Sequence, residues 1–250
     1  MSATRINDIY NYIDTIAPFA TQCEWDNSGM LIGDGSACVS RVLVCLDATR
    51  RAIEKAAELG CELIVTHHPI IFRPIKGIPA QSAVYDLIRG GMSVICAHTN
   101  LDAAAQGVNL RLAEALGLED IHIIENMEMG FGGVLSEPLD RSDFVKYVGD
   151  KLGTVCRASV CDRPIRRVAV IGGAAGDMAQ EAFALGYDAF VTGEVKHHEF
   201  IAAAEYGCCV VAAGHYETED VVTEPLRDML AAQFGGVEFL TYHENLSPCL

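Results

Sequence analysis

Histidine and carboxylate side chains that are suited to binding metal stand directly after apolar, strand-like runs at three places in the chain. Imidazole nitrogen is a ligand for Zn, Fe, Mn and Ni, and carboxylate oxygen can bind or bridge such cations. Pro69 ends the first of these runs, so two adjacent histidines can turn toward one site. The residues are His67, His68, His98, Asp102, His215 and Glu219. Taken singly, each has a structural explanation, such as a core histidine or a helix-capping acid, but three such clusters together predict a metal site.

The sequence repeats itself at about half its length. Residues 41–66 (RVLVCLDATRRAIEKAAELGCELIVT) align without a gap with residues 167–192 (RVAVIGGAAGDMAQEAFALGYDAFVT). A half-length period is typical of an internally duplicated domain. We therefore predict two related repeats, residues 1–128 and 129–250, with the metal residues in a cleft between them.

Hydrophobic periodicity predicts alternating strands and helices in both repeats. Strands are expected at residues 42–46, 63–66, 94–97, 121–124, 168–171, 189–192, 210–213 and 237–240. Helices are expected at residues 5–16, 48–59, 83–89, 108–116, 141–152, 178–185, 197–205 and 221–234. This order predicts an α/β fold of two duplicated units, each with a mixed or parallel sheet that helices cover.

A second group of polar residues is suited to catalysis. Glu194 aligns with His68 of the first repeat, so one copy carries an imidazole where the other carries a carboxylate. Glu194, His98 and His198 are candidates for a general base, a proton shuttle or a substrate contact. A charged first turn of a helix is the alternative explanation for Glu194 and His198.

A glycine-rich turn, Gly172–Gly176, lies between a predicted strand and a predicted helix. Glycines at such a place allow a phosphate group to approach backbone N–H groups. The turn lacks the Lys-Ser/Thr pair of a nucleotide-binding P-loop. A tight turn between strand and helix is the simpler explanation.

The charge balance is acidic, with 18 Lys and Arg against 34 Asp and Glu, and a net charge of −16. Binding to a phosphate backbone needs clustered cations, yet adjacent cations occur only at Arg50-Arg51 and Arg166-Arg167. The composition therefore disfavours nucleic acid as a partner and is compatible with a small-molecule substrate.

The rest of the composition indicates a cytoplasmic protein that does not enter a membrane. No apolar stretch reaches the roughly 18 residues that a membrane-spanning helix needs. The N-terminal segment has no apolar core of the kind that secretory signals carry. Several of the ten cysteines, such as Cys45, Cys61 and Cys96, lie in apolar runs without a CxxC pair, which is typical of reduced, buried thiols.

Five motifs, in order, resemble the Nif-three-like proteins, also called dinuclear-metal-centre hexameric proteins or type-two homologues of GTP cyclohydrolase I. The motifs are WDNSGMLIGD, THHPIIF, AHTNLDAAAQGVN, VTGEVKHHE and AGHYETE. The resemblance implies a toroidal homohexamer with pairs of divalent metals facing an internal cavity. It implies the ligands His67, His68, Asp102, His215 and Glu219, with His98 close by. Many relatives have Asp where this chain has Glu194, and longer members carry an inserted domain.

These observations favour a dinuclear metal hydrolase that acts on a small nucleotide-like or heterocyclic substrate, with two divalent ions per subunit. Paired metals lower the pKa of a bound water and polarise the substrate. A donor set of three histidines and two carboxylates suits Zn, Mn, Fe or Ni alike. The alternative is a non-catalytic regulatory or scaffold protein whose hexameric ring matters more than turnover.

Overall fold

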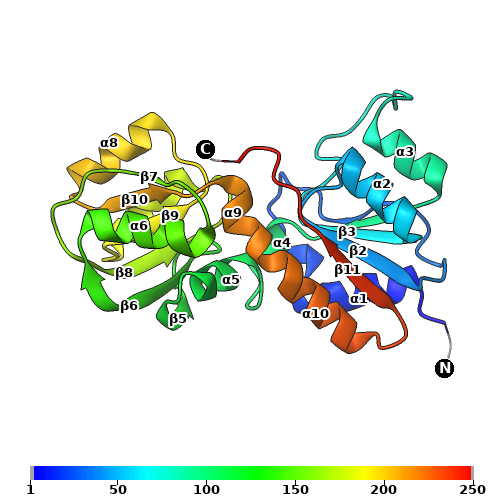
Figure 1. The fold of residues 1–250 in the computed structure, drawn as a ribbon, viewed down its shortest axis with the longest axis horizontal. Coiled ribbons are helices and arrows are strands. Elements are labelled where there is room, and N and C mark those ends of the chain that lie inside the picture. Colours follow the sequence, from blue (N-terminus) through cyan, green and yellow to red (C-terminus); the bar gives the residue numbers. More distant parts are fainter. Residues whose placement is uncertain (1–2, 249–250) are drawn as a thin grey trace. The chain divides into compact units, whose positions relative to one another are not determined.

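Two β-sheets organise the chain, one in each of two structural units (Figure 1). The computed structural model describes residues 3–248. The first unit comprises residues 3–104 and 223–244, and the second comprises residues 105–222 and 245–248. Both units are mixed α/β structures in which helices cover a sheet, as the sequence predicts.

The first sheet has five strands in the order β1-β4-β3-β2-β11. Its strands are β1 (Gly29–Ile32), β2 (Arg41–Cys45), β3 (Leu63–Thr66), β4 (Ser93–Cys96) and β11 (Glu238–Tyr242). All neighbours are parallel except β1, which runs antiparallel to β4. Cys45 pairs with Thr66 and Thr66 pairs with Cys96, so β2, β3 and β4 end at the same edge.

Helices cover both faces of the first sheet. They are α1 (Ile6–Ile16), α2 (Arg50–Leu59), α3 (Ala83–Gly90), the short α4 (Thr99–Asp102), α10 (Thr223–Gln233) and a 3₁₀ turn at Phe19–Thr21. Helices α2 and α3 pack on one face, where Ile53 and Leu87 contact Ile64, and α1 and α10 lie along the opposite face (Figure 1). Helix α2 begins where the Thr49 hydroxyl accepts a hydrogen bond from the Ala52 N–H.

The second sheet has six strands in the order β5-β6-β8-β9-β10-β7. Its strands are β5 (Glu119–Ile123), β6 (Phe131–Leu139), β7 (Arg157–Ala158), β8 (Ile165–Val170), β9 (Ala189–Thr192) and β10 (Cys209–Ala212). The central strands β8, β9 and β10 are parallel, and the other three run antiparallel to their neighbours. The sheet is therefore mixed, with its parallel strands in the middle.

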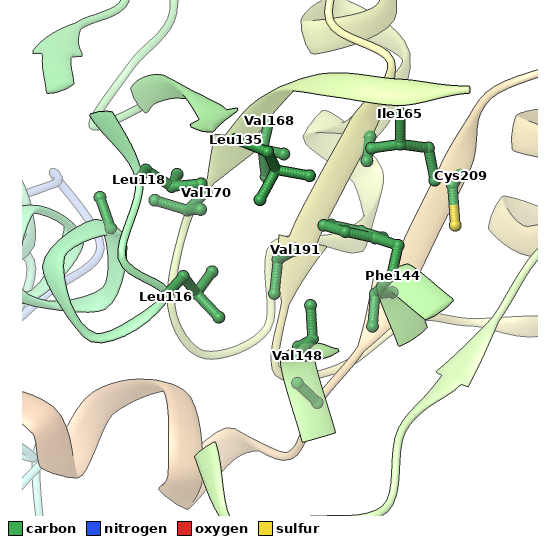
Figure 2. Close-up of a cluster of buried hydrophobic side chains, with 14 of the residues drawn as sticks. Leu116, Leu118, Leu135, Phe144, Val148, Ile165, Val168, Val170, Val191 and Cys209 are labelled. Carbon is green, nitrogen blue, oxygen red and sulfur yellow. The ribbon is translucent and has the colours of Figure 1, made fainter. Parts of the chain in front are cut away.

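Helices also cover both faces of the second sheet. They are α5 (Val108–Ala115), α6 (Arg141–Leu152), α7 (Ala179–Ala184), α8 (His197–Glu205) and α9 (His215–Glu219), with 3₁₀ turns at Gly176–Met178 and Asp220–Val222. Figure 2 shows the core under α6, where Phe144 and Val148 pack against Val191 of the sheet. On the other face, Phe183 of α7 packs in a cluster with Phe190.

The order of the elements repeats along the chain. The series α1-β1-β2-α2-β3-α3-β4-α4-α5-β5 is followed, after β6, by α6-β7-β8-α7-β9-α8-β10-α9-α10-β11. The last helix and strand of each series join the unit that the other series builds, since β5 pairs with β6 and β11 pairs with β2. The structural units therefore differ from the predicted ranges 1–128 and 129–250. That the two repeats superpose stays a prediction.

Two further expectations concern thiols and membranes. The nine described cysteines form no disulfide, and six of them are buried. Within residues 3–248, the helices are too short or too polar to cross a lipid bilayer.

Replacing Phe144 by alanine should lower the free energy of unfolding by about 3–5 kcal/mol, because the ring is fully buried under α6. Denaturant unfolding at equilibrium measures this difference. Ile201→Ala on α8 is the control, because its side chain is 48% exposed and its loss should change the free energy by less than about 0.5 kcal/mol. A Phe144→Ala protein as stable as the parent would contradict the packing of α6.

Candidate metal centre

Three imidazoles meet at the edge of the first sheet where its parallel strands end. His67 and His68 follow β3, and His98 follows the neighbouring strand β4. The His68 N–H donates to Leu46 O at 2.9 Å, and the Ala97 N–H donates to Thr66 O at 2.9 Å, so the parallel register continues past the strands. Each ring offers one nitrogen to a group whose atoms lie within 4.8 Å of one another. The first unit thus contains a three-histidine cluster.

The Nδ1 atom of each of these rings lies within hydrogen-bond distance of a protein oxygen. His67 Nδ1 lies 2.9 Å from Ala97 O, a carbonyl that can only accept, so this nitrogen carries the proton. His68 Nδ1 lies 2.9 Å from Asp47 Oδ1, and His98 Nδ1 lies 2.7 Å from Asp26 Oδ1. A protonated Nδ1 leaves the lone pair of a neutral imidazole on Nε2, the arrangement that metal-binding histidines use. The three rings are therefore fixed in the tautomer that binds metal.

Asp102 adds a carboxylate to the first cluster. It ends the short helix α4, and its Oδ1 lies 3.5 Å from Nε2 of the buried His67. The alternative explanation, a cap for the following helix, does not apply, because α5 has Gly107 at its N-cap position and no side-chain cap. Asp102 therefore faces the imidazole nitrogen that would bind metal.

Asp26 is a supporting residue to which the sequence analysis gave no role. Its side chain is completely buried and accepts hydrogen bonds from His98 Nδ1 and from the N–H and hydroxyl of Thr99. Burial opposes ionisation, but the hydrogen bonds from His98 and Thr99 outweigh it and hold the pKa of Asp26 well below its usual value. Asp26 stands in the quoted WDNSG motif, which was the available signal.

The second unit contributes a histidine–carboxylate group of its own. His215 and Glu219 are the first and last residues of α9, and His215 Nε2 lies 3.1 Å from Glu219 Oε2. On the other side of the ring, His215 Nδ1 lies 2.7 Å from Glu194 Oε1. His215 thus resembles His67 of the first unit, with an oxygen at Nδ1 and an acid beside Nε2, although its Nδ1 partner is a carboxylate instead of a backbone carbonyl.

Glu194 follows β9 as His68 follows β3, so the repeat predicts its position. Its hydrogen bond to His215 gives it a positioning role, and its action as a general base stays a prediction. His198 lies in the first turn of α8 with a side chain that is 76% exposed, and it belongs to none of the ligand groups found among the described residues. Its role in proton transfer also stays a prediction.

The glycine-rich turn packs against this second group. Gly173 has a positive φ of 66°, and a Cβ atom there would collide with Glu219 Oε1. Three backbone N–H groups of the turn are already used, since Gly172 donates to Asn109 Oδ1, Gly173 to Thr218 Oγ1 and Ala175 to Thr192 Oγ1. The tight-turn explanation therefore fits better than phosphate binding. The glycines allow the turn to approach Glu219 closely.

Comparison with known proteins places these groups in context. The model of the Duf34/NIF3 family (NGG1p interacting factor 3) matches residues 4–248. A protein of Clostridium perfringens named GTP cyclohydrolase 1 type 2 homolog is 30% identical over 260 residues, which cover 98% of each chain.

Solved structures agree with this match. A hypothetical protein of Staphylococcus aureus has a TM-score of 0.93 and 27% identity, over 100% of this chain and 99% of that chain. HcgD of Methanocaldococcus jannaschii, solved in reduced form, has a TM-score of 0.81 and 25% identity, over 95% of this chain and 97% of that chain.

Replacing Asp26 by asparagine should lower the free energy of unfolding of chelator-treated protein by about 2 kcal/mol at pH 7, because a buried charged hydrogen bond to His98 is lost. The pKa of Asp26 is lower in the folded state than its ordinary value of 3.8. The stabilisation is therefore complete above pH 3.8 and declines as the pH falls below it.

Denaturant unfolding of both proteins at several pH values measures this difference. The control is Asp34→Asn, because Asp34 lies in an exposed turn, where its carboxylate accepts hydrogen bonds from the N–H and hydroxyl of Ser36. A difference between the Asp26→Asn protein and the parent that grew as the pH fell below 3.8 would contradict the assignment.

Proposed function

This chain belongs to the Duf34/NIF3 family, and on that premise we propose that it is a dinuclear metal hydrolase of a small nucleotide-like or heterocyclic substrate. One observation carries the proposal. Three imidazoles of the proposed ligand set, His67, His68 and His215, each have Nδ1 within hydrogen-bond distance of a protein oxygen, so that Nε2 is left for a metal. The relatives named GTP cyclohydrolase 1 type 2 homolog support the substrate class.

The donor set fits a pair of divalent ions. In the proposal the ligands are His67, His68 and Asp102 of the first unit with His215 and Glu219 of the second. Two carboxylates can bridge or balance two divalent charges, and nitrogen and oxygen donors in this ratio suit Zn, Mn, Fe or Ni. The metals would lower the pKa of a water molecule and polarise the substrate.

We propose that His98 is the general base and general acid that transfers the proton in the reaction. Its Nδ1 is held by the ionised Asp26, so Nε2 can accept a proton from the attacking water and return it to the leaving group. The imidazolium that forms between these steps is stabilised by the buried carboxylate, as in other acid–histidine pairs. Asp47 and Glu194 keep His68 and His215 in the orientation that binds metal.

Metal-dependent turnover separates this proposal from the regulatory alternative. The experiment is a screen of small nucleotides and heterocycles with metal-loaded protein, read for hydrolysis products. Turnover that stops after chelation and returns with the metal supports the hydrolase. A fully loaded protein that hydrolyses nothing in such a screen favours the metal-binding regulator or scaffold.

His68→Ala should lose at least one of two metal equivalents per chain, because His68 supplies a nitrogen ligand that Asp47 holds in place. Elemental analysis of the purified proteins measures the metal content. His122→Ala and His243→Ala are the controls, since these rings contact Tyr187 and Glu224 and belong to none of the ligand groups among the described residues. A His68→Ala protein with the full metal content of the parent would show that the ligand set is wrong.

We also propose that the protein assembles as a homohexamer, as its resemblance to the Nif-three-like proteins implies. Closed rings of identical subunits are a common outcome when one surface patch binds another. Light scattering at micromolar concentration should give six times the chain mass of 26.9 kDa. A monomer under these conditions would refute the assembly but leave the ligand set untouched.

A further inference from the structure

Two exposed aromatic side chains stand beside the three-histidine cluster of the first unit. Trp25 is 61% exposed and Phe72 is 42% exposed. Their ring centroids are 5.8 Å apart, and they lie 6.1 and 6.3 Å from the ring of His98. Large aromatic surfaces left in water beside a polar site are characteristic of ligand recognition rather than of folding.

The rings come from separate segments that are fastened together. Asn27 Nδ2 donates to Ile71 O at 2.5 Å, which ties the segment of Trp25 to that of Phe72. The ring of His98 is itself fixed by Asp26. We call Trp25 and Phe72 the aromatic platform. Its parts are positioned before a ligand arrives, which reduces the entropy lost on binding.

The segment that carries Phe72 is locally basic in an acidic protein. Residues 69–82 (PIIFRPIKGIPAQS) include Arg73 and Lys76 and no acid, whereas the whole chain has a net charge of −16. Both cations are exposed, and neither forms an ion pair with a residue in the described part of the chain. Two such cations, one and four residues after Phe72 in the sequence, favour a ligand that combines an anionic group with a flat ring system.

We propose that the aromatic platform stacks the planar ring of a phosphorylated heteroaromatic ligand, with Arg73 and Lys76 contacting its phosphate. This inference rests on the proposed function and assigns the substrate side of that site. Stacking against aromatic side chains tolerates any flat base and contributes about 1–3 kcal/mol per base. Arginine and lysine then select the phosphorylated form.

The single tryptophan makes the platform directly observable. Trp25 is the only tryptophan in a chain with eight tyrosines, so selective excitation reports on the platform alone. The experiment titrates metal-loaded protein with GMP, AMP, guanosine and ribose 5-phosphate. We expect saturable quenching by GMP and AMP, weaker binding of guanosine and no quenching by ribose 5-phosphate. Added salt should weaken the binding of GMP more than that of guanosine.

Matched variants test each part of the platform. Phe72→Ala should raise the Kd for GMP about tenfold through the loss of one stacking surface. A double change of Arg73→Ala with Lys76→Ala should remove the preference for GMP over guanosine. Tyr206→Ala removes an exposed aromatic ring (53% exposed) from the second unit and should leave both values unchanged. All these side chains are exposed, so the variants should fold like the parent.

The outcomes separate the platform from the metal site. The ligand-stacking proposal is wrong if metal-loaded protein shows no saturable quenching with any nucleotide. It is also wrong if the Phe72→Ala protein binds GMP with the Kd of the parent. Neither result contradicts the hydrolase proposal. Quenching by nucleotides in a protein that never binds metal supports the platform and overturns the metal site. If Phe72→Ala changes the subunit number and no nucleotide quenches Trp25, the rings are an interface between copies and the inference is wrong.

Discussion

The shared edge of three parallel strands is the constraint on which the first site depends. Because Cys45, Thr66 and Cys96 are paired in register, β2, β3 and β4 end at the same level of the sheet, and the residues that follow them lie along one edge. His68 and His98 are thereby brought to one place with their Nδ1 partners beside them. Parallel sheets collect ligands at the carboxyl ends of their strands for this reason. In the second unit, the parallel strands β8, β9 and β10 likewise end at a shared edge, and Glu194 and His215 follow β9 and β10 there.

Burying so many polar groups is costly, and the structure offsets the cost with hydrogen bonds. Asp26 shows this most clearly, because its carboxylate has no exposure yet accepts hydrogen bonds from His98 and Thr99. Replacing a whole buried pair of this kind by apolar side chains of similar volume is often neutral for stability, whereas removing one partner alone is destabilising. The benefit is therefore in orientation: each ring is held in one tautomer before any ligand binds.

The exchange of final segments between the repeats has consequences for folding. Strand β11 pairs with β2, so Glu238 lies opposite Arg41, almost 200 residues earlier in the chain. The first sheet cannot be completed until the C-terminal part of the chain is available. Contacts of such long sequence separation slow folding because the closing loop loses entropy before the contact forms.

The sequence by itself determined the elements and the chemistry of the site, because both are local. Periodicity gave helices such as Arg141–Leu152 and His197–Glu205 with their observed bounds, and the histidine and acid motifs marked the ligand groups. Strand β6 was not predicted, because Gly132, Gly133 and Pro138 are residues that weaken a strand pattern. Only pairing with β8 makes it a strand.

The tertiary structure alone decided which sheet each terminal strand joins and which oxygen holds each imidazole. Asp26 lies 72 residues from His98, and Asp47 lies 21 residues from His68, so no local pattern could link them. Such partners are set by backbone pairing between distant segments, whose energy depends on the whole sheet.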